Sequence, residues 1–211
     1  MHFYKNFLQL GKMYIFCTFL SFLVVSPEII YGETLEKEFS FDKSNIEVTK
    51  TKENYDLITL KDCIFTLNVG EPKLPMKLIH MIVPPNTKDI NISVMSFSKE
   101  ELDGDYYVFP VQPDLPAGQQ SEFVPPNPEI YSLTEEYPGK LAEKSGIGSL
   151  DGCRILGLKL YLFQYLPQYK KIIFYNHLKI RIEIVEGESL IYQVKKRSLK
   201  IQEQIENSVA Y

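Results

Sequence analysis

The sequence predicts a mainly β fold, an antiparallel β-sandwich with a long proline-rich loop and a short C-terminal helical tail. Three stretches alternate in a period of two, which is typical of half-buried antiparallel strands. Proline and glycine separate many shorter strand-like runs, and no long segment with a 3.6-residue period interrupts them. This combination favours a sandwich or barrel over a fold with alternating strands and helices.

The elements follow from these patterns in chain order. Short strands are expected at residues 38–41, 55–60, 64–69, 106–109 and 172–175. Asn176 and His177 predict a turn between the last two strands, and residues 135–144 predict one or two helical turns. A weakly helical tail begins at Ser198. The three alternating stretches carry Ile90, Ile92 and Val94, then Leu158, Leu160 and Leu162, then Ile180, Ile182 and Ile184.

Residues 1–32 have the pattern of a secretory signal. Lys5 and Lys12 precede a 13-residue apolar run at residues 13–25, which is shorter than the roughly 20 residues that span a bilayer. Gly32 offers a small residue for cleavage, although an uncleaved anchor is the alternative. We therefore expect an exported chain, extracellular or periplasmic, with no membrane association after cleavage.

The exported part is long enough for one domain with its own core. We divide it into N-terminal strands at 33–61, the β-sandwich at 62–190, and a basic linker with the helical tail at 191–211. Lys5, Lys12 and Glu28 leave with the signal, so 21 basic and 26 acidic side chains remain, a net charge of −5. Without a basic stripe, we expect no nucleic-acid partner.

The segment at residues 109–128 is the least ordinary part of the chain. It holds six prolines in twenty residues, so it is not a central strand and is expected to lie extended on the surface. Loops of this length in a compact domain are often functional. The candidate contact residues of this loop are Tyr107, Phe109, Pro113, Pro116 and Phe123.

Cysteine chemistry gives two alternatives. Cys63 and Cys153 are able to pair in an exported chain, or each is an ordinary buried thiol beside a strand. A thiol hydrolase would need Cys63 or Cys153 next to His80 or His177, yet no local signature surrounds them. No ligand spacing predicts a metal, and no cofactor is expected.

A series of motifs resembles the propeptide domain of gingipain-type cysteine peptidases. The series begins with a Gly-x-Pro-x-Leu-Pro entry into an apolar strand that stops at a proline pair, and it continues over residues 62–185. The residues that carry the resemblance are Gly70, Pro72, Leu74, Pro75, Pro84, Tyr131, Tyr137, Pro138 and Arg154.

The resemblance implies a β-sandwich that shields the cleft of a gingipain-type peptidase, keeps it latent and assists its folding, in cis or in trans. The catalytic domain of that family is far larger than the 26 residues after Val185, so we expect no peptidase activity from this chain. The alternative is a surface or adhesion β-sandwich that binds a protein or a glycan.

Two features concern the details of such inhibition. Prodomains of this family place a basic residue in the specificity pocket, but residues 100–139 contain no Lys or Arg. Either the partner peptidase has a specificity other than Arg or Lys, or the residue that blocks its specificity pocket lies elsewhere, such as Lys140 or Lys144. Lys195, Lys196 and Arg197 form a basic cluster that is either a processing site or a solvated run of charges.

Overall fold

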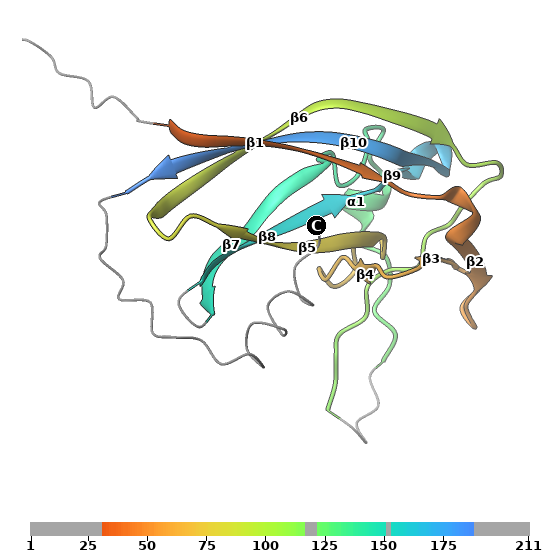
Figure 1. Cartoon of the computed structure of the whole chain (residues 1–211). Coiled ribbons are helices and arrows are strands. Elements are labelled where there is room, and N and C mark those ends of the chain that lie inside the picture. Colours follow the sequence, from red (N-terminus) through yellow and green to blue (C-terminus); the bar gives the residue numbers. More distant parts are fainter. Residues whose placement is uncertain (1–30, 117–121, 151–152, 188–211) are drawn as a thin grey trace, which may run out of the picture.

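The computed structural model describes residues 31–116, 122–150 and 153–187. These residues form two four-stranded sheets and a two-stranded hairpin, and every pairing between named strands is antiparallel (Figure 1). The prediction of a mainly β, antiparallel fold is confirmed. No helix among the described residues is long and apolar enough to cross a membrane.

The first sheet is built around the long strand β10 (Lys171–Glu186). Strand β6 (Thr87–Glu101) pairs along one edge of β10, while β1 (Tyr31–Ser40) and β9 (Phe163–Leu166) share the other edge. Alternation along β10 gives the sheet its two faces, because every second side chain points to the same side. The core-facing residues are Leu178, Ile180, Ile182 and Ile184, all buried.

The second sheet has the order β4, β5, β8, β7, with β4 at Ile64–Phe65, β5 at Pro75–Val83, β8 at Cys153–Tyr161 and β7 at Ala142–Leu150. Its buried face carries Ile79, Met81 and Val83 from β5, and Leu156, Leu158 and Leu160 from β8. The hairpin of β2 (Ile46–Lys50) and β3 (Asp56–Leu60) lies beyond β1 along the chain.

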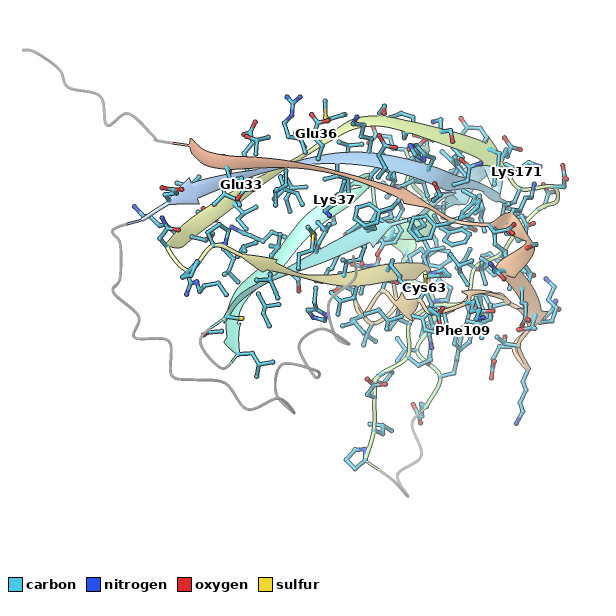
Figure 2. All side chains as sticks on the ribbon, in the orientation of Figure 1. Glu33, Glu36, Lys37, Cys63, Phe109 and Lys171 are labelled. Atoms are coloured by element: carbon cyan, nitrogen blue, oxygen red, sulfur yellow. The ribbon has the colours of Figure 1, made fainter. Side chains whose placement is uncertain are left out.

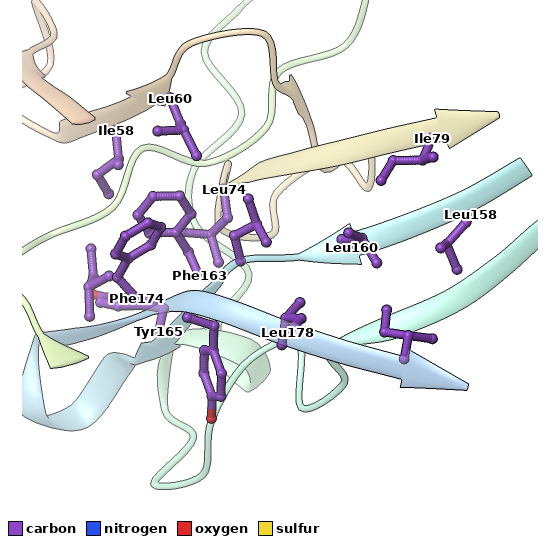
Figure 3. Close-up of a cluster of buried hydrophobic side chains, with 14 of the residues drawn as sticks. Ile58, Leu60, Leu74, Ile79, Leu158, Leu160, Phe163, Tyr165, Phe174 and Leu178 are labelled. Atoms are coloured by element: carbon purple, nitrogen blue, oxygen red, sulfur yellow. The ribbon is translucent and has the colours of Figure 1, made fainter. Parts of the chain in front are cut away.

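The two larger sheets and β3 contribute to one hydrophobic core (Figure 3). The chain crosses from the second sheet to the first at Leu162, between β8 and β9. Because both sheets cover this crossing, the alternation stops and residues 160–165 are all buried. Three short helical turns complete the fold: η1 (Lys43–Asn45), α1 (Pro128–Tyr131) and η2 (Pro167–Tyr169).

Several predicted elements differ in the structure. The turn at Asn176 and His177 is wrong: β10 continues through it, and Asn176 is accommodated as a bulge opposite β6. The chain reverses instead at η2, where Lys170 adopts a left-handed φ of 55°. The helical turns at 135–144 are also wrong, because Ala142 begins β7 and the helix lies at α1.

Two predicted strands are shorter than the sequence indicated. Residues 64–69 form a strand only at Ile64–Phe65, and residues 106–109 contribute a single bridge, at Val108. The signal at 1–32, apart from Tyr31 and Gly32, lies outside the described residues, as does the tail at 191–211.

Candidate functional site

The proline-rich loop is fastened at its base to the turn that precedes β5. The Gly70 amide donates to the carbonyl of Val111 at 2.9 Å, and the Val111 amide donates to the carbonyl of Glu71 at 2.8 Å. From the other limb, the Asn127 amide donates to the carbonyl of Gly70 at 2.8 Å. The Gly-x-Pro motif therefore holds both limbs of the loop.

Gly70 is suited to this position by its backbone. Its φ of +82° lies in the left-handed region, which a side chain rarely adopts. The extended stretch at Pro72 forms an antiparallel bridge with Pro110. Figure 1 shows the two green limbs extending away from both sheets beyond this base.

Gln112 joins the two limbs to each other. Its side-chain carbonyl accepts from the amide of Val124 at 2.8 Å, and its Nε2 donates to the carbonyl of Val124 at 2.9 Å. The same Nε2 lies 3.1 Å from the carbonyl of Pro110. A glutamine side chain thus takes the place of a backbone ladder that the neighbouring prolines cannot supply.

Asp56, at the start of β3, anchors the first limb from the opposite side. Its carboxylate accepts from the Tyr107 amide at 2.8 Å and pairs with Lys50 at 2.8 Å. Its backbone amide donates to Tyr107, and its carbonyl accepts from Phe109 at 2.8 Å. Asp56 is only 4% exposed, and each of its two carboxylate oxygens has a partner, as a buried charged group requires.

The aromatic residues at the loop base form a continuous series of ring contacts. Tyr55 stacks on Tyr107 with ring centroids 4.7 Å apart, and it also contacts Phe109 and Phe123 at 6.0 and 5.7 Å. Tyr107 in turn meets Tyr131 edge-on. Phe109, labelled in Figure 2, therefore lies inside the base, whereas Phe123 and Tyr107 keep 38% and 44% of their surface exposed.

Two tyrosine hydroxyls connect this series to the core. Tyr131 donates to the carbonyl of Val108 at 2.7 Å, and the fully buried Tyr165 donates to the carbonyl of Tyr106 at 2.9 Å. Burial raises the pKa of Tyr165 to about 12 and raises the pKa of Tyr131 even further. Both hydroxyls thus stay protonated and remain donors at neutral pH.

Tyr137, from the Tyr-Pro part of the motif series, also contacts the loop base. The Tyr137 hydroxyl donates to the Glu71 carboxylate at 2.5 Å, and Asn68 donates to the same carboxylate at 2.9 Å. The segment that carries Tyr137 is held by Gln164, which is fully buried. Gln164 accepts from the Gly139 amide and donates to the Lys140 carbonyl, each at 2.8 Å.

The remaining motif residues support the sheets. Leu74 is 1% exposed, and Pro75 begins β5. Pro84 follows β5, and its carbonyl accepts from the amide and hydroxyl of Thr87 at 3.0 and 2.7 Å. Arg154 donates to the carbonyl of Thr87 at 2.8 Å and so braces the turn between β5 and β6.

Lys140 and Lys144, the alternative blocking residues, are both paired. Lys140 lies 2.5 Å from Glu143 and stands over the ring of Tyr161, beside a hollow of about 440 Å³ at the loop base. Lys144 pairs with Asp89. Neither lysine side chain therefore projects unpaired beside the loop, as a residue that enters a specificity pocket would. Two exposed apolar side chains also flank this base, Leu67 at 69% and Val69 at 49%, with the exposed Asn68 between them.

Cys63 and Cys153 are free cysteines, so the disulfide is not formed. Cys63 lies beside the β4 end of β5, whereas Cys153 begins β8 near Val83, where β5 ends. At ~3.3 Å per residue these ends are more than ~20 Å apart, and a disulfide requires a Cα separation below about 7 Å. Burial also raises the pKa of Cys63, which is unfavourable for a thiolate nucleophile.

The order of these motifs and the fold that joins them correspond to a known family. A family model of C25 propeptides (Propeptide_C25) matches residues 35–209. The chain belongs to this propeptide family. The match covers the propeptide domain of these peptidases and not their catalytic domain. No curated protein matches the sequence significantly.

Two solved structures share the fold of this propeptide. One is a chain in the complex of the pro- and mature domains of RgpB from Porphyromonas gingivalis, with a TM-score of 0.67, 15% identity, and coverage of 83% of this chain and 91% of that chain. The other, from work on the zymogenic latency of gingipain K from the same organism, has a TM-score of 0.63, 21% identity, and coverage of 78% and 97%.

Three residues that fix the loop were not foreseen from the sequence: Asp56, Gln112 and Gln164. Of these, only Gln164 has a signal in the sequence, because it is a polar residue inside the apolar run at 160–165. Among the described loop residues, Pro113 is half-buried, while Pro116 and Leu115 are exposed. No group of three potential metal ligands occurs in the described part of the chain.

Proposed function

We propose that this propeptide keeps a gingipain-type cysteine peptidase latent by laying its proline-rich loop against the catalytic cleft. The observation that carries the proposal is the construction of the loop base, where backbone hydrogen bonds, Gln112 and the aromatic series hold two limbs in a projecting position. Limbs that are already held in place before binding lose less conformational entropy in the complex, which favours tight inhibition.

The contact surface extends from the limbs onto the domain. Leu115 and Phe123 on the limbs are 40% and 38% exposed, and Leu67 and Val69 flank the base. Apolar and aromatic side chains of this kind form the centre of protein interfaces. The peptidase thus covers both the loop and the neighbouring side of the second sheet.

The chemistry of the limbs indicates the specificity of the partner. The loop carries Asp114 and Glu122 and no basic residue, and Lys140 is paired with Glu143 at the base. A pocket built for Arg or Lys contains negative charge, which would repel these carboxylates. The partner is therefore a relative of the gingipains whose cleft accepts neutral or apolar side chains.

Export and processing belong to the same proposal. Residues 1–32 act as a cleaved signal, which places inhibitor and peptidase in the same extracellular or periplasmic space. Lys195, Lys196 and Arg197 form the processing site after the last strand, and cleavage there releases the propeptide. Assistance in folding follows from the same contact, because a partner that binds only the folded peptidase stabilises it by mass action.

The test compares two matched substitutions in residues 33–211, titrated against a gingipain-type peptidase domain encoded by the same organism. Leu115→Asp places a charge on the limb, and Met95→Asp places one at an equally exposed position of β6. We expect Leu115→Asp to raise the inhibition constant at least tenfold and Met95→Asp to leave it unchanged. Equal inhibition by both variants would contradict the proposed contact, and peptide or glycan binding by an uninhibitory chain would favour the adhesion alternative.

A further inference from the structure

The hollow at the loop base is bordered by charged and aromatic side chains. It has a volume of about 440 Å³ and lies between the Gly-x-Pro turn, the segment that carries Tyr137, and strands β5, β7 and β8. This volume is within the range of clefts that bind small ligands, and it is ample for one long side chain. Two carboxylates line the hollow, Glu71 from the turn and Glu143 from β7.

Glu143 is neutralised within the chain. The Lys140 Nζ lies 2.5 Å from its carboxylate, and the Lys159 Nζ lies 3.5 Å from the same carboxylate. The Tyr161 hydroxyl also donates to it, at 2.5 Å. Both lysines that line the hollow are thus engaged by this one carboxylate, and no ion pair among the described residues joins either of them to Glu71.

Glu71, by contrast, has only neutral donors. Its Oε2 accepts from the Tyr137 hydroxyl at 2.5 Å and from the Asn68 Nδ2 at 2.9 Å. Within the described part of the chain, its Oε1 accepts no hydrogen bond and its carboxylate forms no ion pair. Three other half-buried glutamates each pair with a lysine: Glu100, Glu136 and Glu143. The half-buried charge of Glu71 is therefore left without a cation.

The hollow is continuous with the proposed inhibitory surface. The exposed Leu67 lines the hollow and also flanks the loop base. Glu71 belongs to the turn that holds the first limb, because its carbonyl accepts from the amide of Val111 at 2.8 Å. A peptidase that covers the limbs and the loop base therefore also covers the mouth of the hollow, where one of its side chains can enter.

The walls of the hollow favour arginine over lysine as this side chain. A guanidinium is planar and carries several N–H donors, so it can bond a carboxylate oxygen and lie against an aromatic ring at the same time. Tyr137 and Tyr161 supply aromatic rings to the lining. Arginine is also enriched at protein interfaces, whereas lysine is depleted there.

We propose that the hollow at the loop base receives an arginine side chain of the peptidase, whose guanidinium pairs with Glu71. The inference rests on the proposed latency function, because this arginine belongs to the inhibited enzyme. It adds a contact outside the catalytic cleft that determines specificity: the propeptide favours peptidases that carry an arginine at this position. The ion pair also makes part of the affinity sensitive to salt.

The test measures the inhibition constant of residues 33–211 against a gingipain-type peptidase domain from the same organism, at low and high NaCl concentration. Glu71→Gln removes the charge and keeps a side-chain carbonyl that accepts from Tyr137 and Asn68. We expect it to raise the inhibition constant about tenfold and to weaken the effect of salt. Glu183→Gln, at a half-buried glutamate of β10 that has no ion pair among the described residues, removes the same charge and should leave the constant unchanged.

A second variant gives a prediction of opposite sign. Lys159→Gln removes a positive charge from the hollow, so it should lower the inhibition constant by about twofold or more. A higher constant for Lys159→Gln would assign the hollow to an acidic group of the peptidase and overturn the proposal. If the unmodified chain inhibits fully, an unchanged constant for Glu71→Gln would overturn the arginine contact and leave the latency function intact. An unmodified chain that fails to inhibit would overturn both.

Discussion

The hydroxyl of Tyr137 donates a 2.5 Å hydrogen bond to the carboxylate of Glu71, 66 residues earlier in the chain. This contact joins the Tyr-Pro motif to the Gly-x-Pro turn. The Gly-x-Pro turn is hydrogen-bonded to both limbs of the loop. The separate motifs thus meet in a single support at the loop base, although they are far apart in the sequence.

Tyr137→Phe tests this support directly. The substitution keeps the ring and removes the donor, so we expect the free energy of unfolding in urea to fall by about 1.5–2 kcal/mol, as for hydrogen bonds to charged groups. Tyr169→Phe, at a residue that is 60% exposed, is the control and should change nothing. Equal stability of the two variants would show that the Tyr137–Glu71 contact contributes little.

Gly70 should tolerate substitution according to backbone preference and not side-chain size. Gly70→Ala forces a Cβ into the left-handed region and should destabilise the chain by about 1–2 kcal/mol. Gly70→Asn is larger but adopts this conformation more readily, so its loss should be smaller. Thermal unfolding of both variants provides the measurement, and a larger loss for Asn would contradict the conformational explanation.

Gln112 is expected to affect inhibition more than stability. Gln112→Ala removes the hydrogen bonds between the limbs and should raise the inhibition constant about tenfold, while the free energy of unfolding changes by about 1 kcal/mol or less. Gln168→Ala, at an exposed position in η2, is the matched control. An unchanged inhibition constant for Gln112→Ala would contradict the idea that inhibition depends on the fixed position of the two limbs.

The buried tyrosines predict loss of stability at alkaline pH. Burial raises the pKa of Tyr165 to about 12, and it raises the pKa of Tyr131 and Tyr137 further, above the ordinary value of ~10. The folded state therefore binds these protons more tightly than the unfolded state. Their contribution is complete below pH ~10 and is lost as the pH rises to about 12 and beyond.

Urea unfolding at a series of pH values, together with the tyrosinate absorbance, checks this expectation. Stability should fall with rising pH above ~10, and a fraction of the tyrosines should ionise only on unfolding. Simultaneous ionisation of all tyrosines near pH 10 without loss of structure would contradict the burial of these side chains.

The strands were largely predictable because burial imposes a two-residue period on them. Ile180, Ile182 and Ile184 alternate as expected, and they line the core side of β10. The turn at Asn176 was not predictable, because a bulge and a turn favour the same polar residues. Only the pairing with β6 decides between them, and that pairing is a long-range contact.

The candidate site was predictable as a segment but not as a structure. Six prolines identified the loop at 109–128, yet its shape depends on Asp56 and Gln112, whose partners are distant or are backbone groups. The aromatic side chains of Tyr107 and Phe123 contact Tyr55 at the loop base and stay 44% and 38% exposed, so their role in binding a peptidase stays a prediction.

The most direct test of the central claim is a titration of a gingipain-type peptidase domain from the same organism with residues 33–211, followed by peptide hydrolysis. A latency propeptide should abolish activity at about one equivalent, and the pair should elute as one complex in size-exclusion chromatography. Full activity in a large excess of the chain, with no complex formed, would contradict the account.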